Sequence, residues 1–107
     1  MNFEKTFGET IKKLREEKKL PLRQVAEALE IDTSMLGKIE KNSRKPTRAL
    51  IEKISKYFNV SDKNLIIAFL SDEVAYHVIY EESYASEVLK VAEEKVEYLK
   101  TKKTLNP

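Results

Sequence analysis

The chain has 107 residues, enough for one domain with its own core, and 20 Lys and Arg against 18 Asp and Glu leave a net charge of only +2. It contains no cysteine, which excludes disulfides and thiolate metal sites and favours a reducing compartment. The start, MNFEKTFGETIKK, is charged and lacks a long apolar run, which predicts a soluble, cytoplasmic protein without a signal peptide or membrane span.

Charge is distributed unevenly along the chain. Residues 1–60 hold 14 Lys and Arg against 9 Asp and Glu, whereas residues 61–107 hold 6 against 9. A solvated surface is the ordinary explanation of basic clusters, but a basic half beside an acidic half also suits a protein that turns one end toward phosphates.

The first two predicted helices are marked by their N-terminal residues. Thr6 and Glu9 have the spacing of a capping box, and apolar residues then recur at helical spacing, which predicts a helix over 7–18. Pro21 suits the first turn of a second helix, over 22–29, because a proline lacks the amide that such a turn leaves unpaired.

A short break separates this second helix from a third. The apolar face of the second helix ends at 30–32, and Asp32 can cap a helix over 33–41 by accepting from the amide of Ser34 or Met35. Leu36 and Ile39 supply its inward side. Two short helices joined by such a turn form the helix-turn-helix pattern, in which the second helix can enter a DNA groove.

Two more helices complete the predicted domain. Asn42 can adopt the left-handed conformation that ends a helix, and a basic loop, KNSRKP, follows it. The next helix covers 48–58 and ends at Asn59, and Ser61 with Asp62 caps a fifth helix. No run alternates apolar and polar residues for long enough to form a strand, so the fold class is all-α.

The series LREEKKLPLRQVAEALEIDTSMLGKIEKNSRKPTRALIEKISKYFNVSDKNL resembles the lambda-repressor-like (Cro/cI, XRE) helix-turn-helix domains in length, helix order and spacing. The resemblance covers about residues 7–70. It implies a five-helix DNA-binding domain over 1–70, followed by a C-terminal helical extension over 71–107.

The resemblance also implies roles for individual residues. Arg15 and Glu40 occupy positions that pair to lock the first helix onto the end of the third, a structural rather than a base-reading role. The base-reading positions are Thr33, Ser34, Met35 and Lys38, although Met35 could instead pack against the second helix and Lys38 could contact a phosphate. The predicted phosphate contacts are Lys41, Asn42, Ser43, Arg44, Lys45 and Arg48.

Two positions depart from the family pattern. Leu22 stands where many relatives carry a glutamine that binds a phosphate, and Glu30 stands where a glycine often makes the turn. A non-glycine residue in that turn implies strain, and an exposed carboxylate there would repel phosphate.

The extension has a pattern of its own. Residues 83–102 carry Val88, Ala92, Val96 and Leu99 at steps of three and four, which is one face of an amphipathic helix. Such a face either packs back on the domain or forms a dimer, and the dimer is favoured because helix-turn-helix domains bind two half-sites. The chain after about residue 102 is predicted to be disordered.

These patterns indicate a homodimeric, sequence-specific regulator of transcription that binds double-stranded DNA at a palindromic operator. The resemblance implies a bacterial, phage or plasmid origin and a repressor or controller that regulates its own gene. We expect no enzyme, cofactor or metal site, because His77 is the only histidine and no phosphate-binding loop occurs. The alternative function is a protein-interaction module, such as an antitoxin or adaptor, acting through its C-terminal helices.

Overall fold

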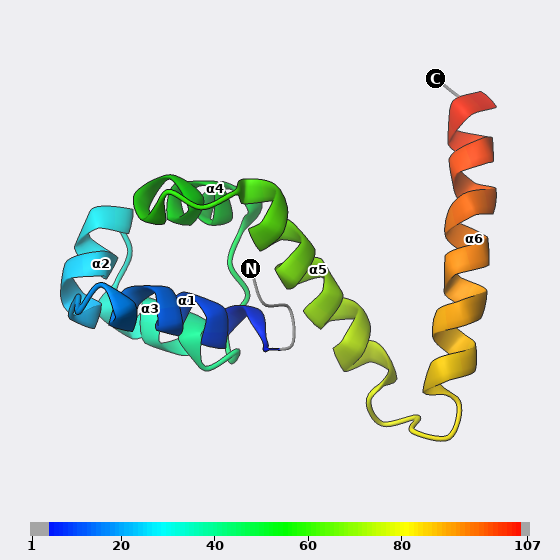
Figure 1. The fold of residues 1–107 in the computed structure, drawn as a ribbon, viewed down its shortest axis with the longest axis horizontal. Coiled ribbons are helices and arrows are strands. Elements are labelled where there is room, and N and C mark those ends of the chain that lie inside the picture. The colour runs from blue at the N-terminus through cyan, green and yellow to red at the C-terminus, as the bar shows by residue number, and fades with distance from the viewer. Residues whose placement is uncertain (1–4, 106–107) are drawn as a thin grey trace. The chain divides into compact units, whose positions relative to one another are not determined.

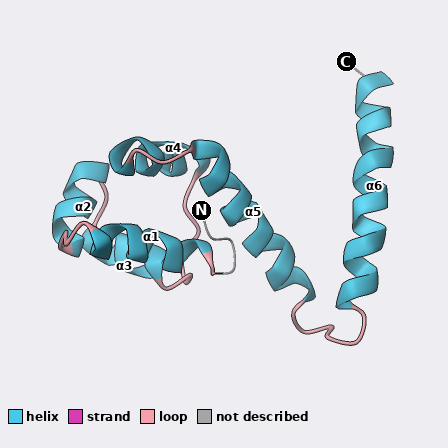
Figure 2. Ribbon diagram, viewed as in Figure 1, coloured by secondary structure: helices cyan, strands magenta, loops and turns pink. Residues whose placement is uncertain are grey.

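The structure, a computed structural model, describes residues 5–105. Those residues form six helices and no strand, so the all-α prediction is confirmed (Figures 1 and 2). No helix among them combines the length and the apolar content that a membrane span requires. The helices are α1 (Phe7–Glu17), α2 (Leu22–Leu29), α3 (Thr33–Glu40), α4 (Arg48–Phe58), α5 (Asp62–Val78) and α6 (Ala85–Leu105).

The first four helices lie close to their predicted bounds. The helices α2 and α4 begin and end at the predicted residues, while α1 and α3 each end one residue earlier. Lys18 and Lys41, the predicted last residues, have left the helical conformation and serve as the C-caps of α1 and α3. Differences of this size reflect fraying of the last turn.

Side-chain caps begin three of the helices, and one predicted cap is wrong. Thr6, Thr47 and Ser61 each accept a hydrogen bond from the backbone amide three residues later, at 3.1–3.3 Å. Asp32 has the extended backbone of an N-cap, but its side chain makes no capping bond. The Asp32 side chain is exposed, as are those of Thr47 and Ser61, and its carboxylate faces water.

The chain divides into two compact units, one ending at Asp72 and the other beginning at Glu73. In the first unit, α3 packs against both α1 and α2, and α2 also packs against α4. Every helix of this unit contributes side chains to one core, which consists of Phe7, Ile11, Val25, Ala26, Leu29, Leu36, Ile39, Leu50, Ile51, Ile54, Phe58, Leu65 and Ala68.

The helix α5 continues past the predicted domain boundary at residue 70. It ends at Val78, so the boundary between the two units falls inside a helix rather than in a loop. No glycine or proline occurs between Asp62 and Val78 to stop it.

The second unit contains α6, which is longer than the predicted helix over 83–102. It begins at Ala85 and runs to Leu105, so the prediction of a disordered tail is wrong for residues 103–105. Lysine and leucine favour helix, and the chain meets no helix-breaking residue before Asn106 and Pro107. Those last two residues lie outside the described part of the chain.

Candidate nucleic-acid interface

The turn between α2 and α3 is built on Glu30. Its backbone is left-handed, with φ 60° and ψ 42°, and the amide of Ile31 donates to the carbonyl of Ala26 at 3.0 Å. This pattern of bonds pairs the last carbonyls of α2 and turns the chain sharply toward α3. A residue with a Cβ pays a strain cost in this conformation, as the sequence pattern predicts at this position.

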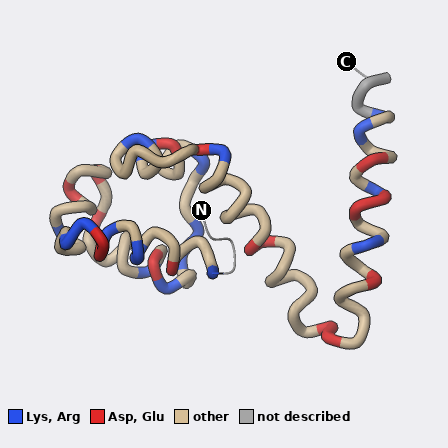
Figure 3. Tube along the Cα trace, viewed as in Figure 1, with Lys and Arg blue, Asp and Glu red and all other residues tan. Residues whose placement is uncertain are grey.

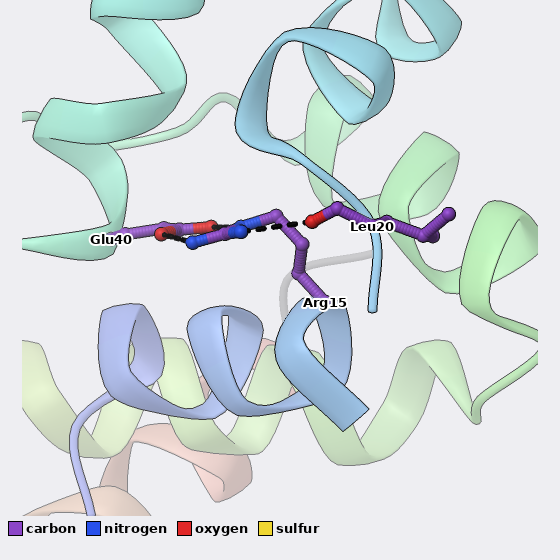
Figure 4. Close-up of polar contacts among 3 residues, drawn as sticks. All are labelled: Arg15, Leu20 and Glu40. Atoms are coloured by element: carbon purple, nitrogen blue, oxygen red, sulfur yellow. Dashed lines mark hydrogen bonds and ion pairs between the residues drawn. The ribbon is translucent and has the colours of Figure 1, made fainter. Parts of the chain in front are cut away.

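An ion pair holds the end of α3 against α1. The Arg15 guanidinium donates from Nε to Glu40 Oε2 at 2.7 Å and from Nη2 to Glu40 Oε1 at 3.0 Å (Figure 4). Its Nη1 also donates to the carbonyl oxygen of Leu20 at 2.9 Å, so one side chain joins α1, the α1–α2 loop and α3. Both side chains are largely buried, at 14% and 5% exposed.

This hydrogen bond to Glu40 raises the pKa of Arg15 above its ordinary value, against the opposing effect of burial. The pair expected from the family resemblance is therefore present as a bidentate, charged contact. Its geometry fixes the orientation of α3 relative to α1.

A second clamp joins α1 to α3 at Gly8. The amide of Gly8 donates to Asn42 Oδ1 at 2.9 Å, and Asn42 Nδ2 donates to Thr6 Oγ1 at 2.7 Å. A Cβ on Gly8 would clash with the carbonyl oxygens of Ile39 and Glu40. Only glycine therefore permits α1 to approach the end of α3 this closely. The sequence prediction missed Gly8, although a glycine inside a helical pattern is itself a signal of close packing.

The outward side of α3 carries three of the four predicted base-reading residues. Thr33, Ser34 and Lys38 are exposed, and Ser34 and Lys38 are four apart on one face of the helix. Met35 is half-buried and packs against the core, which is the packing alternative considered for it.

The predicted phosphate residues fall into two groups. Asn42 and Ser43 have structural partners: Asn42 holds Gly8, and Ser43 closes α3 through its amide and hydroxyl, both donating to the Lys38 carbonyl. The other members of the group are exposed basic side chains at the end of α3, in the loop after it and at the start of α4: Lys41, Arg44, Lys45 and Arg48. Figure 3 shows the basic residues distributed over the helices of this unit.

The two departures from the family pattern have local explanations. Leu22 is half-buried and packs against the core, and a Cβ on Gly37 would lie 3.5 Å from its Cδ2, so Leu22 helps to pack α2 against α3. The Glu30 side chain is 80% exposed, with Lys53 Nζ at 3.9 Å from its Oε1. An exposed pair at this distance partly offsets the negative charge of Glu30 but adds little stability.

The sequence prediction also missed Asp72. The amide of Phe7, at the start of α1, donates to Asp72 Oδ2 at 2.7 Å. Burial raises the pKa of Asp72 above its usual value, although the hydrogen bond from Phe7 acts in the opposite direction. The amide of Phe7 is one of those that the first turn of a helix leaves without an intrahelical acceptor. Asp72, 65 residues later in the chain, supplies that acceptor.

The predicted dimer residues lie on α6. Val88, Val96 and Leu99 are 43%, 50% and 60% exposed in the single chain, and Ala92 between them is also exposed.

Within residues 5–105 the structure brings together no group of three His, Cys, Asp or Glu side chains that could hold a metal ion.

Comparisons with known proteins agree with this geometry. Residues 11–63 match the family described as helix-turn-helix. A stretch of 59 residues, 55% of this chain, is 37% identical to the HTH-type transcriptional regulator SutR of Escherichia coli (strain K12). The matched region spans only 33% of that relative's length. No significant match to a solved structure was found.

Proposed function

Through residues 11–63 the chain belongs to the lambda-repressor-like (Cro/cI, XRE) helix-turn-helix family, and we propose that it is a sequence-specific, DNA-binding regulator of transcription. The observation that carries the proposal is the arrangement of α3. Its inward side is fixed by the Arg15–Glu40 pair, while Thr33 and Ser34 are exposed on its first turn and Lys38 is exposed on its last turn. A rigidly held helix with exposed polar side chains near its N-terminus suits the major groove.

In this proposal, Lys38 is the main residue that reads the base sequence. Its ammonium can donate to guanine O6 or N7, while Thr33 and Ser34 can bond several base edges and discriminate weakly. Met35 keeps part of its surface exposed and can contact a thymine methyl group.

Phosphate contacts fall to the exposed cations around the loop after α3: Lys41, Arg44, Lys45 and Arg48. Asn42 and Ser43, with their polar groups engaged inside the domain, position this loop instead. Contacts of this kind supply most of the affinity of such an interface and make the affinity depend on salt.

We further propose a homodimer that binds a palindromic operator and regulates its own gene. The support is the exposed apolar face of α6, which one copy leaves uncovered, and the relation between twofold proteins and paired half-sites about 34 Å apart. The relative from Escherichia coli is named a transcriptional regulator, which supports a role in transcription for this chain as well.

The test is a salt series of binding to DNA from the gene's own upstream region and to random DNA of equal length. We expect Lys38→Ala to lose the preference for upstream DNA, by roughly 5- to 150-fold, because one good base contact is worth about 1–3 kcal/mol of discrimination. Arg44→Ala should weaken binding to both DNAs alike and reduce the salt slope by about 1.

Lys90→Ala is the matched control, because it removes the same charge from an exposed position on α6. It should leave preference and salt slope close to those of the wild type. Equal, weak binding of the wild-type chain to both DNAs would contradict the proposal. That result would support the protein-interaction function, with the exposed face of α6 as the contact surface.

A further inference from the structure

The apolar side of α6 follows a seven-residue period. Ala85, Ala92 and Leu99 are seven residues apart, and Val88 and Val96 lie beside them on the same side of the helix. A period of seven keeps one helix face turned toward a second helix over several turns. The opposite side is made of charged and polar residues, as in a helix that packs along one face only.

Charge changes sign along the length of this helix. Residues 81–94 contain five glutamates and one lysine, whereas residues 95–103 contain four lysines and one glutamate. We infer that α6 packs against α6 of a second copy of this chain in antiparallel orientation, so that the acidic half of each helix lies against the basic half of the other. In a parallel pair, acidic would face acidic and basic would face basic, and the two helix dipoles would also point the same way.

Lys95 distinguishes the two orientations most clearly. It lies seven residues after Val88, on the apolar side of α6, so a parallel pair in register would place it directly against Lys95 of the second copy. In an antiparallel pair whose twofold axis passes between Glu93 and Glu94, Lys95 lies opposite Ala92 of the second copy. The small side chain of Ala92 leaves room for the lysine stem, and the ammonium can reach Glu94 of that copy.

In this arrangement, Leu99 of the second copy fits a shallow hollow on the surface of α6. A shallow hollow is lined by Tyr84, Glu87, Val88, Val91, Ala92 and Lys95. The same centre of symmetry places Leu99 of the second copy over Val88, within this hollow. Leu99 is 60% exposed in the single chain, and this contact would cover it with apolar side chains.

This inference rests on the proposed dimer and adds its orientation. Because the chain has no cysteine, single cysteines report on the orientation without background. Full-length Val88→Cys and Leu99→Cys are oxidised separately and as an equal mixture after subunit exchange, with one variant enlarged by a fused tag. Ser86→Cys, on the polar side of α6, measures random collision.

An antiparallel pair predicts that the disulfide between residues 88 and 99 dominates in the mixture, by about tenfold over the Ser86→Cys background. Efficient self-crosslinking of each single variant, without the mixed product, would show parallel packing and overturn the inference. Background levels in every combination, with monomers in sedimentation, would also overturn it. Binding of upstream DNA by the reduced variants is measured alongside, so loss of the orientation is distinguishable from loss of the DNA-binding function.

Charge reversal supplies a second measurement that needs no crosslink. Glu94→Lys should weaken dimerisation by about tenfold, because it removes the partner of Lys95, and adding Lys95→Glu in the same chain should restore it. Parallel packing predicts no weakening from Glu94→Lys, because like charges would face each other before and after. An unchanged dimer affinity would therefore contradict the antiparallel arrangement.

Discussion

The two units of this chain obtain their stability in different ways. The first unit encloses a core to which five helices contribute, and it adds polar clamps between helices at Arg15, Asn42 and Asp72. In α6, by contrast, Ala85 alone is partly shielded among residues 85–102, and the ion pair between Lys100 and Glu97 is fully on the surface. The first unit therefore has a core of its own, whereas the apolar face of α6 is exposed in the single chain.

The ion pairs of the two units provide the sharpest test of that contrast. Glu40→Ala should lower the free energy of unfolding by about 3 kcal/mol, because it leaves the Arg15 charge buried without its carboxylate. Glu97→Ala removes the partner of Lys100 at 3.3 Å, where both side chains are about 70% exposed, and should cost less than about 0.5 kcal/mol. Urea unfolding of the full chain measures both. Equal losses would contradict the contrast.

A smaller effect is expected at the closest approach of two helices in the first unit. Gly8→Ala should cost about 1–3 kcal/mol, because the added Cβ meets backbone carbonyls of α3 that cannot move independently. Gly37→Ala is the matched control within α3, since its Cβ would meet only a Leu22 methyl at 3.5 Å. The control should gain about 0.5–1 kcal/mol from helix propensity, as read by thermal unfolding. Equal destabilisation of both variants would show that the close approach of α1 to α3 at Gly8 is not the cause of the loss.

Among the contacts of the first unit, the smallest expected effect lies at Asp72, at the end of that unit. Asp72→Ala should lower stability by about 1 kcal/mol through the lost hydrogen bond, whereas Asp72→Asn keeps an acceptor for the Phe7 amide. Because the folded-state pKa of Asp72 is raised, protonation favours the folded chain, and this gain appears as pH falls through that pKa toward the unfolded value of 3.8.

The pH dependence is measured as the stability difference between wild type and Asp72→Asn over a series of urea unfolding curves. As the pH falls from the raised pKa of folded Asp72 toward 3.8, the free energy of unfolding of the wild type should increase relative to that of Asp72→Asn. A constant difference, or one of opposite sign, would show that the carboxylate is not held at the margin of the core.

Local patterns were sufficient to predict most helices. Asn59 was predicted to end a helix over 48–58, and it is the left-handed C-cap of α4. Pro21 was predicted at the start of a helix over 22–29, and it directly precedes α2. The family resemblance added the pairing of Arg15 with Glu40, which no local pattern contains.

The errors arise where the outcome depends on distant residues or on solvent. The contact of Gly8 with α3 and that of Asp72 with α1 join positions 34 and 65 residues apart, so no short pattern predicts them. The hydrogen bonds that Asn42 and Ser43 make within the fold were also not predicted, while their role as phosphate contacts stays a prediction. Asp32 was predicted as a cap from its residue type and position alone, and these do not fix the conformation of its side chain, which makes no capping bond.

The hydrogen bond from Phe7 to Asp72 also affects how the chain folds during synthesis. Ribosomes add about 5–20 residues per second, so the 65 residues between donor and acceptor correspond to roughly 3–13 seconds of translation. A helix such as α1 forms within about a microsecond, far sooner than its last hydrogen-bond acceptor is made. The start of α1 therefore completes its hydrogen bonding only after α5 has emerged from the ribosome.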